Sequence, residues 1–402
     1  MKNTFLCLFI FLNSIWGYSQ EKQSFPKGVI IDSVKIANTL NESYAVYLPK
    51  QYVKEVPSAI VFIFDPDARG KIGIEPFVLA AETYNYILVC SNNSKNGPVD
   101  VNLEIAGRLF DSVSTEFNLN PSQLYISGFS GGARLVSGIA VSSTAFEGVI
   151  ACGASFNELD KFALQEGTFS YVGIVGDRDM NYQEMIGNKE WLDVMMVKNT
   201  LFVDHQEHAW PSQKQMLRAF DWLEIQAFKK NIRKSNESTI KRIYDENLKI
   251  ADSLKGKNEL ISAVDEYERC NEIYGNKKDS EIKSIIEAIK NGKEYKSQIR
   301  VRGEIIALEN KTTSLFLDQL DNELKVAKSE NDFKFWKTEL KRLKEKKMKS
   351  NDVAIKSMVD RLYSMINASV YGAAQESKRN FQNDKLAYCK ELEKVIHSIE
   401  IN

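Results

Sequence analysis

Proline and glycine are concentrated in the first half of the chain, and this uneven distribution constrains the fold more than any other feature. All eight prolines occur at or before Pro211, and 16 of the 21 glycines precede residue 230. Both residues mark turns between short elements and are disfavoured inside helices. The 402-residue chain is long enough for two hydrophobic cores. We therefore predict an element-dense domain over residues 20–229 and an all-α helical domain over residues 230–402.

The N-terminus has the pattern of a targeting segment. Lys2 is followed by the apolar run 5–11, and the small residues Gly17 and Ser19 come at the spacing of a signal-peptidase site. We expect residues 1–19 to be a signal peptide and the mature protein to be exported, either periplasmic or extracellular; a hydrophobic first strand is the alternative. The apolar run is shorter than the roughly 20 residues of a membrane-spanning helix. No later stretch approaches that length, so we expect no integral membrane span.

Short apolar runs alternate with helix-length segments up to residue 229. The runs predicted as strands are 44–48, 59–64, 86–90, 123–127, 148–152, 171–175 and 200–203, and the predicted helices are 101–117, 131–141, 189–197 and 211–228. Continuous apolar strands separated by helices predict an α/β fold, a mainly parallel sheet with helices on both faces. Ligand sites in such sheets gather at the carboxyl ends of the strands. We therefore expect the functional residues to lie there.

After residue 230 apolar residues recur with the period of a helix, as at Ile282, Ile285, Ile286 and Ile289. Segments 263–267 and 385–388 faintly resemble tetratricopeptide-type repeats, but no period of about 34 residues can be aligned. Both an irregular bundle and a repeat array therefore fit the pattern. This region could bind a protein partner, cover the active site or dimerise.

The sequence Gly128-Phe129-Ser130-Gly131-Gly132 matches the pattern G-x-S-x-G. It lies between a predicted strand and a predicted helix, the setting in which a tight turn exposes a nucleophilic serine hydroxyl. Gly128 and Gly132 are expected where helix and strand approach too closely for a side chain. Ser130 is thus the candidate nucleophile, and the alternative is a glycine-rich turn with an idle serine.

A serine hydroxyl needs a neighbouring base, and the chain contains three histidines. His397 lies at the end of the helical half, whereas His205 and His208 follow a predicted strand. We favour His208 as the base because Ala209, Trp210 and Pro211 begin a helix and fix its loop. His205 is the alternate.

The base in turn needs a carboxylate that orients its imidazole ring. Asp177 and Asp179 both follow the predicted strand 171–175. We favour Asp179, which lies just past the turn. Asp177 is the alternate, since it could instead pair with Arg178 or cap the next segment.

The chain order Ser, Asp, His is the order of the alpha/beta-hydrolase family, and residues 43–229 resemble its small esterases, dienelactone hydrolases and polyhydroxybutyrate depolymerases. The resemblance implies acyl transfer through a covalent intermediate on Ser130 and a small-molecule or polymer-derived ester as substrate. A serine peptidase of the same fold is one alternative. A catalytically inactive descendant that serves as a binding or scaffold protein is another. The resemblance does not extend to the helical half.

One departure concerns the oxyanion hole. Many relatives carry His-Gly after the third strand, whereas this chain has an acidic, proline-containing loop over residues 65–70. The resemblance implies donors from the backbone N–H of Gly131 and of Asp67 or Ala68, because Pro66 has no N–H. Four polar or small residues after the strand 86–90 are expected either at the edge of the pocket or as turn formers: Asn92, Asn93, Asn96 and Gly97.

Composition argues against several other functions. The net charge of -1 gives no general attraction for nucleic acid. The chain has no phosphate-binding loop, dinucleotide-binding fingerprint or zinc-ligand spacing, and its three histidines leave little for a metal site. We therefore expect no cofactor and no metal. Cys90 and Cys152 lie in apolar runs and are expected to be buried thiols.

Overall fold

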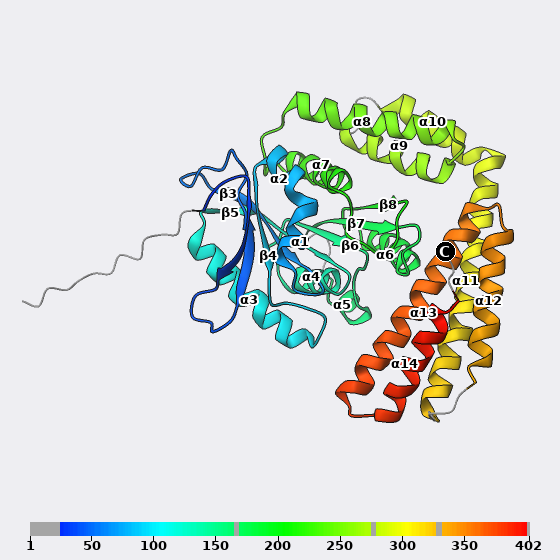
Figure 1. The fold of residues 1–402 in the computed structure, drawn as a ribbon. Helices are drawn as coiled ribbons and strands as arrows, with labels where there is room; N and C mark the ends of the chain where they lie inside the picture. The colour runs from blue at the N-terminus through cyan, green and yellow to red at the C-terminus, as the bar shows by residue number, and fades with distance from the viewer. Residues whose placement is uncertain (1–24, 165–168, 275–278, 327–331, 400–402) are drawn as a thin grey trace, which may run out of the picture.

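The computed structural model describes residues 25–164, 169–274, 279–326 and 332–399 (Figure 1). The expected signal peptide, residues 1–19, lies outside the described residues. Within these ranges, no helix combines the length and the apolar character required to cross a membrane. The chain first forms an α/β region, residues 25–229, and then a helical region, residues 230–399. The exact domain boundary at residue 229 stays a prediction.

An eight-stranded sheet forms the centre of the α/β region. In spatial order its strands are β1 (Ile30–Lys35), β2 (Ser43–Tyr47), β4 (Tyr86–Ser91), β3 (Ser58–Phe64), β5 (Leu119–Phe129), β6 (Gly148–Cys152), β7 (Ser170–Gly176) and β8 (Asn199–Asp204). Strand β2 is antiparallel to both of its neighbours, and the strands from β4 to β8 are parallel. The predicted mainly parallel sheet is confirmed, and every predicted strand overlaps an observed one.

Strand β1 is missing from the sequence prediction for a physical reason. It is an edge strand whose pairing with β2 is interrupted between Ile31 and Val34. Ser33 within it has a φ of 62°, and two of its residues at this irregularity are exposed. The alternation of apolar and polar residues that identifies a half-buried strand is therefore broken.

Helices cover both faces of the sheet. Helices α3 (Val99–Glu116), α4 (Gly131–Ser142) and α6 (Tyr182–Val194) pack on one face, and α1 (Gly70–Ile74), α2 (Val78–Tyr84) and α7 (Gln213–Lys229) on the other. Short α5 (Glu158–Ala163) follows β6, and a 3-10 turn, η1 (Glu75–Phe77), joins α1 to α2. Helices α1, α2 and α5 are absent from the sequence prediction because they are too short to show a periodic pattern.

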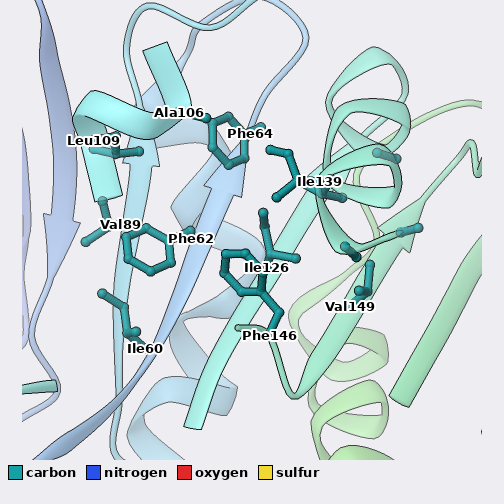
Figure 2. Packing of buried hydrophobic residues seen from close by; sticks show 14 of the residues in the cluster. Ile60, Phe62, Phe64, Val89, Ala106, Leu109, Ile126, Ile139, Phe146 and Val149 are labelled. Carbon is teal, nitrogen blue, oxygen red and sulfur yellow. The ribbon is translucent and has the colours of Figure 1, made fainter. Parts of the chain in front are cut away.

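Alternate residues of the central strands supply the two cores. In β3, Ile60, Phe62 and Phe64 contact the α3 and α4 side, as Figure 2 shows, whereas Val61 and Ile63 face α2 and α7. All seven residues of β3 are buried. This full burial explains why the parallel strands appear in the sequence as continuous apolar runs.

The described residues of the helical region form seven helices: α8 (Glu237–Gly256), α9 (Leu260–Tyr274), α10 (Asp279–Asn291), α11 (Lys293–Lys325), α12 (Lys334–Lys349), α13 (Val353–Arg379) and α14 (Asn383–His397). Helices α8 to α10 share one apolar core, and α11 to α14 share another. Helix lengths range from 13 to 33 residues. These unequal helix lengths fit an irregular bundle, and the resemblance to tetratricopeptide-type repeats is not confirmed.

The helical region contacts the α/β region along α7 and the edge strand β8. Arg269 of α9 donates hydrogen bonds to Thr200 Oγ1 and to the carbonyl of Leu201, both at 3.2 Å. Glu266 of α9 forms an ion pair with Arg218 of α7 at 2.7 Å. Figure 1 shows α8 to α10 beside α7 and the bundle of α11 to α14 beyond β8. The edge of the sheet at β8 is thereby covered.

Candidate active site

Ser130 lies in a strained turn between β5 and α4. Its φ of 53° and ψ of -119° lie outside the regions that non-glycine residues ordinarily adopt. A Cβ at Gly128 would lie 2.3 Å from the backbone of Gly132, and a Cβ at Gly132 would lie 2.0 Å from the carbonyl oxygen of Phe64. Glycine is therefore required at both positions, as predicted. Strain of this size is typical of functional sites.

Ser130, His208 and Asp179 lie within hydrogen-bonding distance in series. Nε2 of His208 is 2.9 Å from Ser130 Oγ, and Nδ1 of His208 is 2.8 Å from Asp179 Oδ2. A carboxylate can only accept, so Nδ1 carries the proton donated to Asp179. Nε2 is then left as an acceptor for the serine hydroxyl. The three residues favoured from the sequence are the ones that the fold brings together.

Each of these residues follows the carboxyl end of a different parallel strand. Ser130 follows β5, Asp179 follows β7, and His208 follows β8. Asp179 is 1% exposed, and its other oxygen accepts the backbone N–H of Asn181 at 2.8 Å. The His208 ring lies against Phe129, with 4.6 Å between the ring centroids. The imidazole is thus held by packing on its face and by hydrogen bonds at both nitrogens.

Two further residues shape the site and were not predicted from the sequence. Gly153, after β6, has a φ of 66°, and a Cβ there would lie 3.1 Å from His208 and 3.2 Å from Asp179. The side-chain amide of Asn181 donates to the Gly153 carbonyl at 2.6 Å. In the sequence, the only indication of the role of Gly153 was a glycine directly after the strand ending at Cys152. The need for glycine there arises from contacts with His208 and Asp179 on distant loops, which the spacing of residues does not reveal.

The two alternates, His205 and Asp177, pair with each other. Nδ1 of His205 is 2.6 Å from Asp177 Oδ2, and the His205 side chain is 70% exposed. By contrast, the His208 side chain is 20% exposed. The fold therefore contains two histidine–aspartate pairs, and one of them reaches Ser130.

The loop between β3 and α1 is organised by the buried carboxylate of Asp65. Its Oδ1 accepts from the N–H of Asp67 and from Arg69 Nε, both at 2.9 Å, and its Oδ2 accepts from Trp210 Nε1 at 2.9 Å. The N–H of Ala68 donates to the Asp65 carbonyl at 3.1 Å. Burial raises the pKa of Asp65, but Arg69, Trp210 and the Asp67 N–H outweigh it and hold the pKa below its ordinary value.

These bonds bear directly on the predicted oxyanion hole. Gly131 is the first residue of α4, where N–H groups have no partner within the helix. The N–H groups of Asp67 and Ala68 are instead both occupied by Asp65. In this arrangement neither is a free second donor, so the donor expected from Asp67 or Ala68 stays a prediction. The Asp65 carboxylate accepts the Asp67 N–H, and the Asp65 backbone carbonyl accepts the Ala68 N–H.

A pocket of about 290 Å³ opens beside Gly131, between the loop after β4 and α4. Asn96 and Gly97 line it, as one sequence interpretation expected. The Asn96 side chain lies so close to Gly131 that a Cβ there would be 1.8 Å from its Oδ1. Asn92 and Asn93 instead support the turn: they accept hydrogen bonds from the N–H groups of Gly70 at 3.0 Å and Ser43 at 2.8 Å.

The lining of this pocket is mixed. Val99, Leu103 and Leu135 contribute apolar surface, while Lys95 and Arg134 contribute charge. Arg134 is itself paired with Glu184 at 2.7 Å. The pocket thus offers a partly apolar space beside Gly131, of a size that suits a small group rather than a long chain.

Metal-ligand clusters and reactive thiols are not features of this site. Among the described ranges, no group of three or more His, Cys, Asp or Glu side chains could hold a metal ion. Cys90 and Cys152 are free and buried in the core, as expected. Burial raises the pKa of both thiols well above the ordinary value. Their thiolate forms are therefore disfavoured, whereas the Ser130 hydroxyl lies beside an imidazole nitrogen.

A parallel sheet with a serine elbow after β5, followed in chain order by an aspartate and a histidine at later strand ends, defines the fold. The α/β region has the α/β-hydrolase fold. No protein-family model and no curated protein matches the chain.

Several solved structures are similar to about half of the chain. S-formylglutathione hydrolase from Staphylococcus aureus matches at 15% identity and a TM-score of 0.40, covering 50% of this chain and 99% of that one. A feruloyl esterase module from Clostridium thermocellum matches at 14% identity and a TM-score of 0.39, covering 49% and 87%. A putative dienelactone hydrolase from Klebsiella pneumoniae matches at 14% and 0.38, covering 50% and 97%. The fold assignment rests on strand order and the elbow.

Proposed function

We propose that the protein is a serine hydrolase that cleaves carboxylic esters through an acyl-enzyme on Ser130. The observation that carries this proposal is the hydrogen-bonded series from Ser130 Oγ through His208 to Asp179, with distances of 2.9 and 2.8 Å. This arrangement supplies a nucleophile, a base and an orienting carboxylate, hydrogen-bonded in the order that proton transfer requires. The buried position of Asp179 shields its charge from solvent and strengthens its effect on the imidazole.

In the first half of the reaction, Ser130 Oγ attacks the ester carbonyl carbon while His208 Nε2 takes its proton. The resulting oxyanion is stabilised by the Gly131 N–H, and Asp179 stabilises the imidazolium. The tetrahedral intermediate then breaks its carbon–oxygen bond to the alcohol, which leaves with the proton from His208. The acyl group remains as an ester of Ser130.

In the second half, His208 removes a proton from water as the water attacks the acyl-enzyme. Collapse of the second tetrahedral intermediate breaks the bond to Ser130 Oγ, which regains a proton from His208. The products are a carboxylic acid and free enzyme. The cycle needs no cofactor, because every proton that leaves one group is received by another.

A second oxyanion donor from Asp67 or Ala68 stays a prediction. Either N–H would have to exchange its bond to Asp65 for a bond to the oxyanion when substrate binds. The lack of one such donor lowers kcat by about 10²-fold to 10³-fold in other hydrolases. The enzyme is therefore expected to be slow towards substrates that do not draw this loop into place.

The partly apolar pocket of about 290 Å³ beside Gly131 has room for a compact acyl or alcohol group. It therefore favours a small-molecule or polymer-derived ester as the substrate.

We also propose that the chain is exported, on the basis of the sequence of residues 1–19. N-terminal sequencing of the protein from periplasmic and extracellular fractions tests this. An uncleaved N-terminus in the cytosol would contradict it.

A fluorophosphonate probe tests the catalytic proposal directly. The wild-type protein should be labelled and should hydrolyse p-nitrophenyl acetate, whereas Ser130→Ala should do neither. His205→Ala is the matched control, since His205 is an exposed histidine three residues from His208, and it should retain both properties. Equal labelling of wild type and Ser130→Ala would refute the assignment. Folded wild-type protein without turnover or labelling would instead favour a binding or scaffold role, and cleavage of peptide p-nitroanilides alone would favour a peptidase.

A further inference from the structure

The helical region reaches the loop that carries Asp179. Arg361 of α13 donates from Nη1 to the carbonyl oxygen of Asp177 at 2.6 Å. Its guanidinium also lies over the ring of Tyr182, 4.7 Å from the centroid. Asp177 and Tyr182 flank Asp179 on either side in the sequence. A single side chain from the second half of the chain thus contacts both ends of the acid loop, residues 177–182.

Arg361 is held rigidly by a carboxylate of its own region. Glu309 of α11 accepts from Arg361 Nε at 2.9 Å and from Nη2 at 2.6 Å. Arg361 is 5% exposed and Glu309 is 4% exposed. Two parallel hydrogen bonds fix the plane of the guanidinium as well as its position. The remaining nitrogen, Nη1, is therefore aimed at the acid loop.

The acid loop is in turn connected to the histidine loop. The N–H of Asp177 donates to the Asp204 carbonyl at 2.8 Å, and the N–H of Arg178 donates to the Gln206 carbonyl at 3.1 Å. Tyr182 donates its N–H to the Asp179 carbonyl at 2.9 Å. The segment that Arg361 contacts therefore carries Asp179 and is bonded to the chain leading to His208.

We propose that Glu309 and Arg361 form a clamp through which the helical region positions Asp179 against His208. Arg361 is a positioning residue, because it contacts the acid loop and not the reacting atoms. This inference rests on the proposed function, since it assigns the clamp a role in ester hydrolysis. It gives the helical region a task within the same chain, in addition to any external partner.

The expected fall in kcat after loss of the clamp follows from the alignment that Asp179 and His208 require. The hydrogen bond between Asp179 and His208 requires alignment of a carboxylate on one loop with a ring on another. Displacement of a catalytic group by about 1 Å can lower the rate about 10²-fold. Loss of the clamp should therefore reduce kcat and leave KM nearly unchanged, because the pocket beside Gly131 is lined by other segments.

Steady-state kinetics on full-length variants test the clamp. Arg361→Met should lower kcat on p-nitrophenyl acetate about 10-fold to 100-fold with KM within about twofold. Arg361→Lys should restore part of the rate, because it can still donate to the Asp177 carbonyl. Arg300→Met is the matched control: Arg300 lies on α11 in an exposed pair with Glu304 and should behave as wild type.

A purely structural role predicts a different pattern. Leu340 is fully buried in the core shared by α11 to α14, so Leu340→Ala weakens the bundle without touching the clamp. An equal fall in kcat for Leu340→Ala and Arg361→Met would overturn the proposal, as would an unchanged kcat in folded Arg361→Met. A larger fall for Arg361→Met than for Leu340→Ala would support it.

Hydrogen exchange separates failure of the clamp from failure of the proposed function. Amide exchange in residues 176–182 should increase in Arg361→Met and stay at the wild-type rate in Arg300→Met. This measurement does not depend on turnover. A wild-type protein without esterase activity would refute the proposed function, whereas unchanged exchange in Arg361→Met would refute the clamp.

Discussion

The α/β region and the helical region are each stabilised by their own apolar cores, and the contacts between them that position the site are polar. No hydrophobic cluster among the described residues combines side chains from both regions. The contacts that join them include the ion pair of Arg218 with Glu266 and the hydrogen bond from Arg361 to Asp177. Apolar burial is non-directional, whereas charged hydrogen bonds fix orientation. The comparison suggests that the cores give stability and that the polar contacts set the alignment of the regions.

The first prediction concerns where the chemistry lies, and it carries the largest effect. His208→Ala should lower kcat on p-nitrophenyl acetate by at least about 10³-fold, because Ser130 loses its base. His205→Ala should leave kcat within about twofold of wild type. The pair is a close match: both residues bond an aspartate of the same loop. Similar losses in both variants would show that the exposed pair shares the catalytic task.

The second prediction tests whether the two cores are independent. Trp336 is 1% exposed in the core of α11 to α14, so Trp336→Ala should lower the stability of that bundle by about 3–5 kcal/mol. Differential scanning calorimetry should then show an earlier transition for the helical region and a later one near the wild-type temperature for the α/β region. A single transition that shifts as a whole would show that the regions unfold as one unit.

The sequence predicted the central strands and the serine elbow of the α/β region because their signals are local. A buried parallel strand is apolar along its whole length, and the elbow at Ser130 requires glycines at fixed spacing. His208 and Asp179 were accessible because histidine is scarce and because strand ends meet at one edge of a sheet. The oxyanion loop was harder to predict. The Asp65 carboxylate that accepts the Asp67 N–H also accepts from Trp210 Nε1, and Trp210 lies 145 residues from Asp65 in the sequence.

For the helical region, the sequence predicted the helices but not how they pack. Its periodic pattern predicts helices, but the pattern is compatible with many packings, among them an irregular bundle and a repeat array. The pairing of Glu309 with Arg361 joins positions 52 residues apart, and the contact with Asp177 spans 184. Charged residues are common on helices, so no local signal distinguishes these from solvent-exposed ones.

The third prediction weakens the polar junction. Glu266 is 4% exposed and bonded to both Arg218 and Arg269. Glu266→Gln should leave two arginines without their carboxylate and lower the free energy of unfolding by about 3 kcal/mol, the scale for one partner removed from a buried pair. Chemical denaturation monitored by fluorescence measures this. A change below about 1 kcal/mol would show that the junction contributes little to stability.

The fourth prediction uses pH on the same carboxylate. Burial raises the pKa of Glu266, but Arg269 and Arg218 outweigh it and hold the pKa below the ordinary value of 4.5. A lowered folded pKa means that this stabilisation is complete above the unfolded pKa and is lost as pH falls through the folded one. Wild-type stability should therefore decline more steeply below pH 4.5 than that of Glu266→Gln. Parallel declines would contradict the assignment.

The fifth and smallest effect is expected from an ion pair that lies on one helix and faces solvent. Arg300 and Glu304 are 2.6 Å apart on α11, and their side chains are 64% and 62% exposed. Water screens such a pair, and ordering two long side chains opposes it, so Glu304→Gln should change the free energy of unfolding by at most about 0.5 kcal/mol. Denaturation of this variant beside Glu266→Gln compares a charge on the surface with one at the junction. An equal loss of unfolding free energy in Glu304→Gln and Glu266→Gln would show that burial adds nothing to the ion pair at the junction. The proposed difference between apolar cores, which give stability, and buried polar contacts, which align the two regions, would then be wrong.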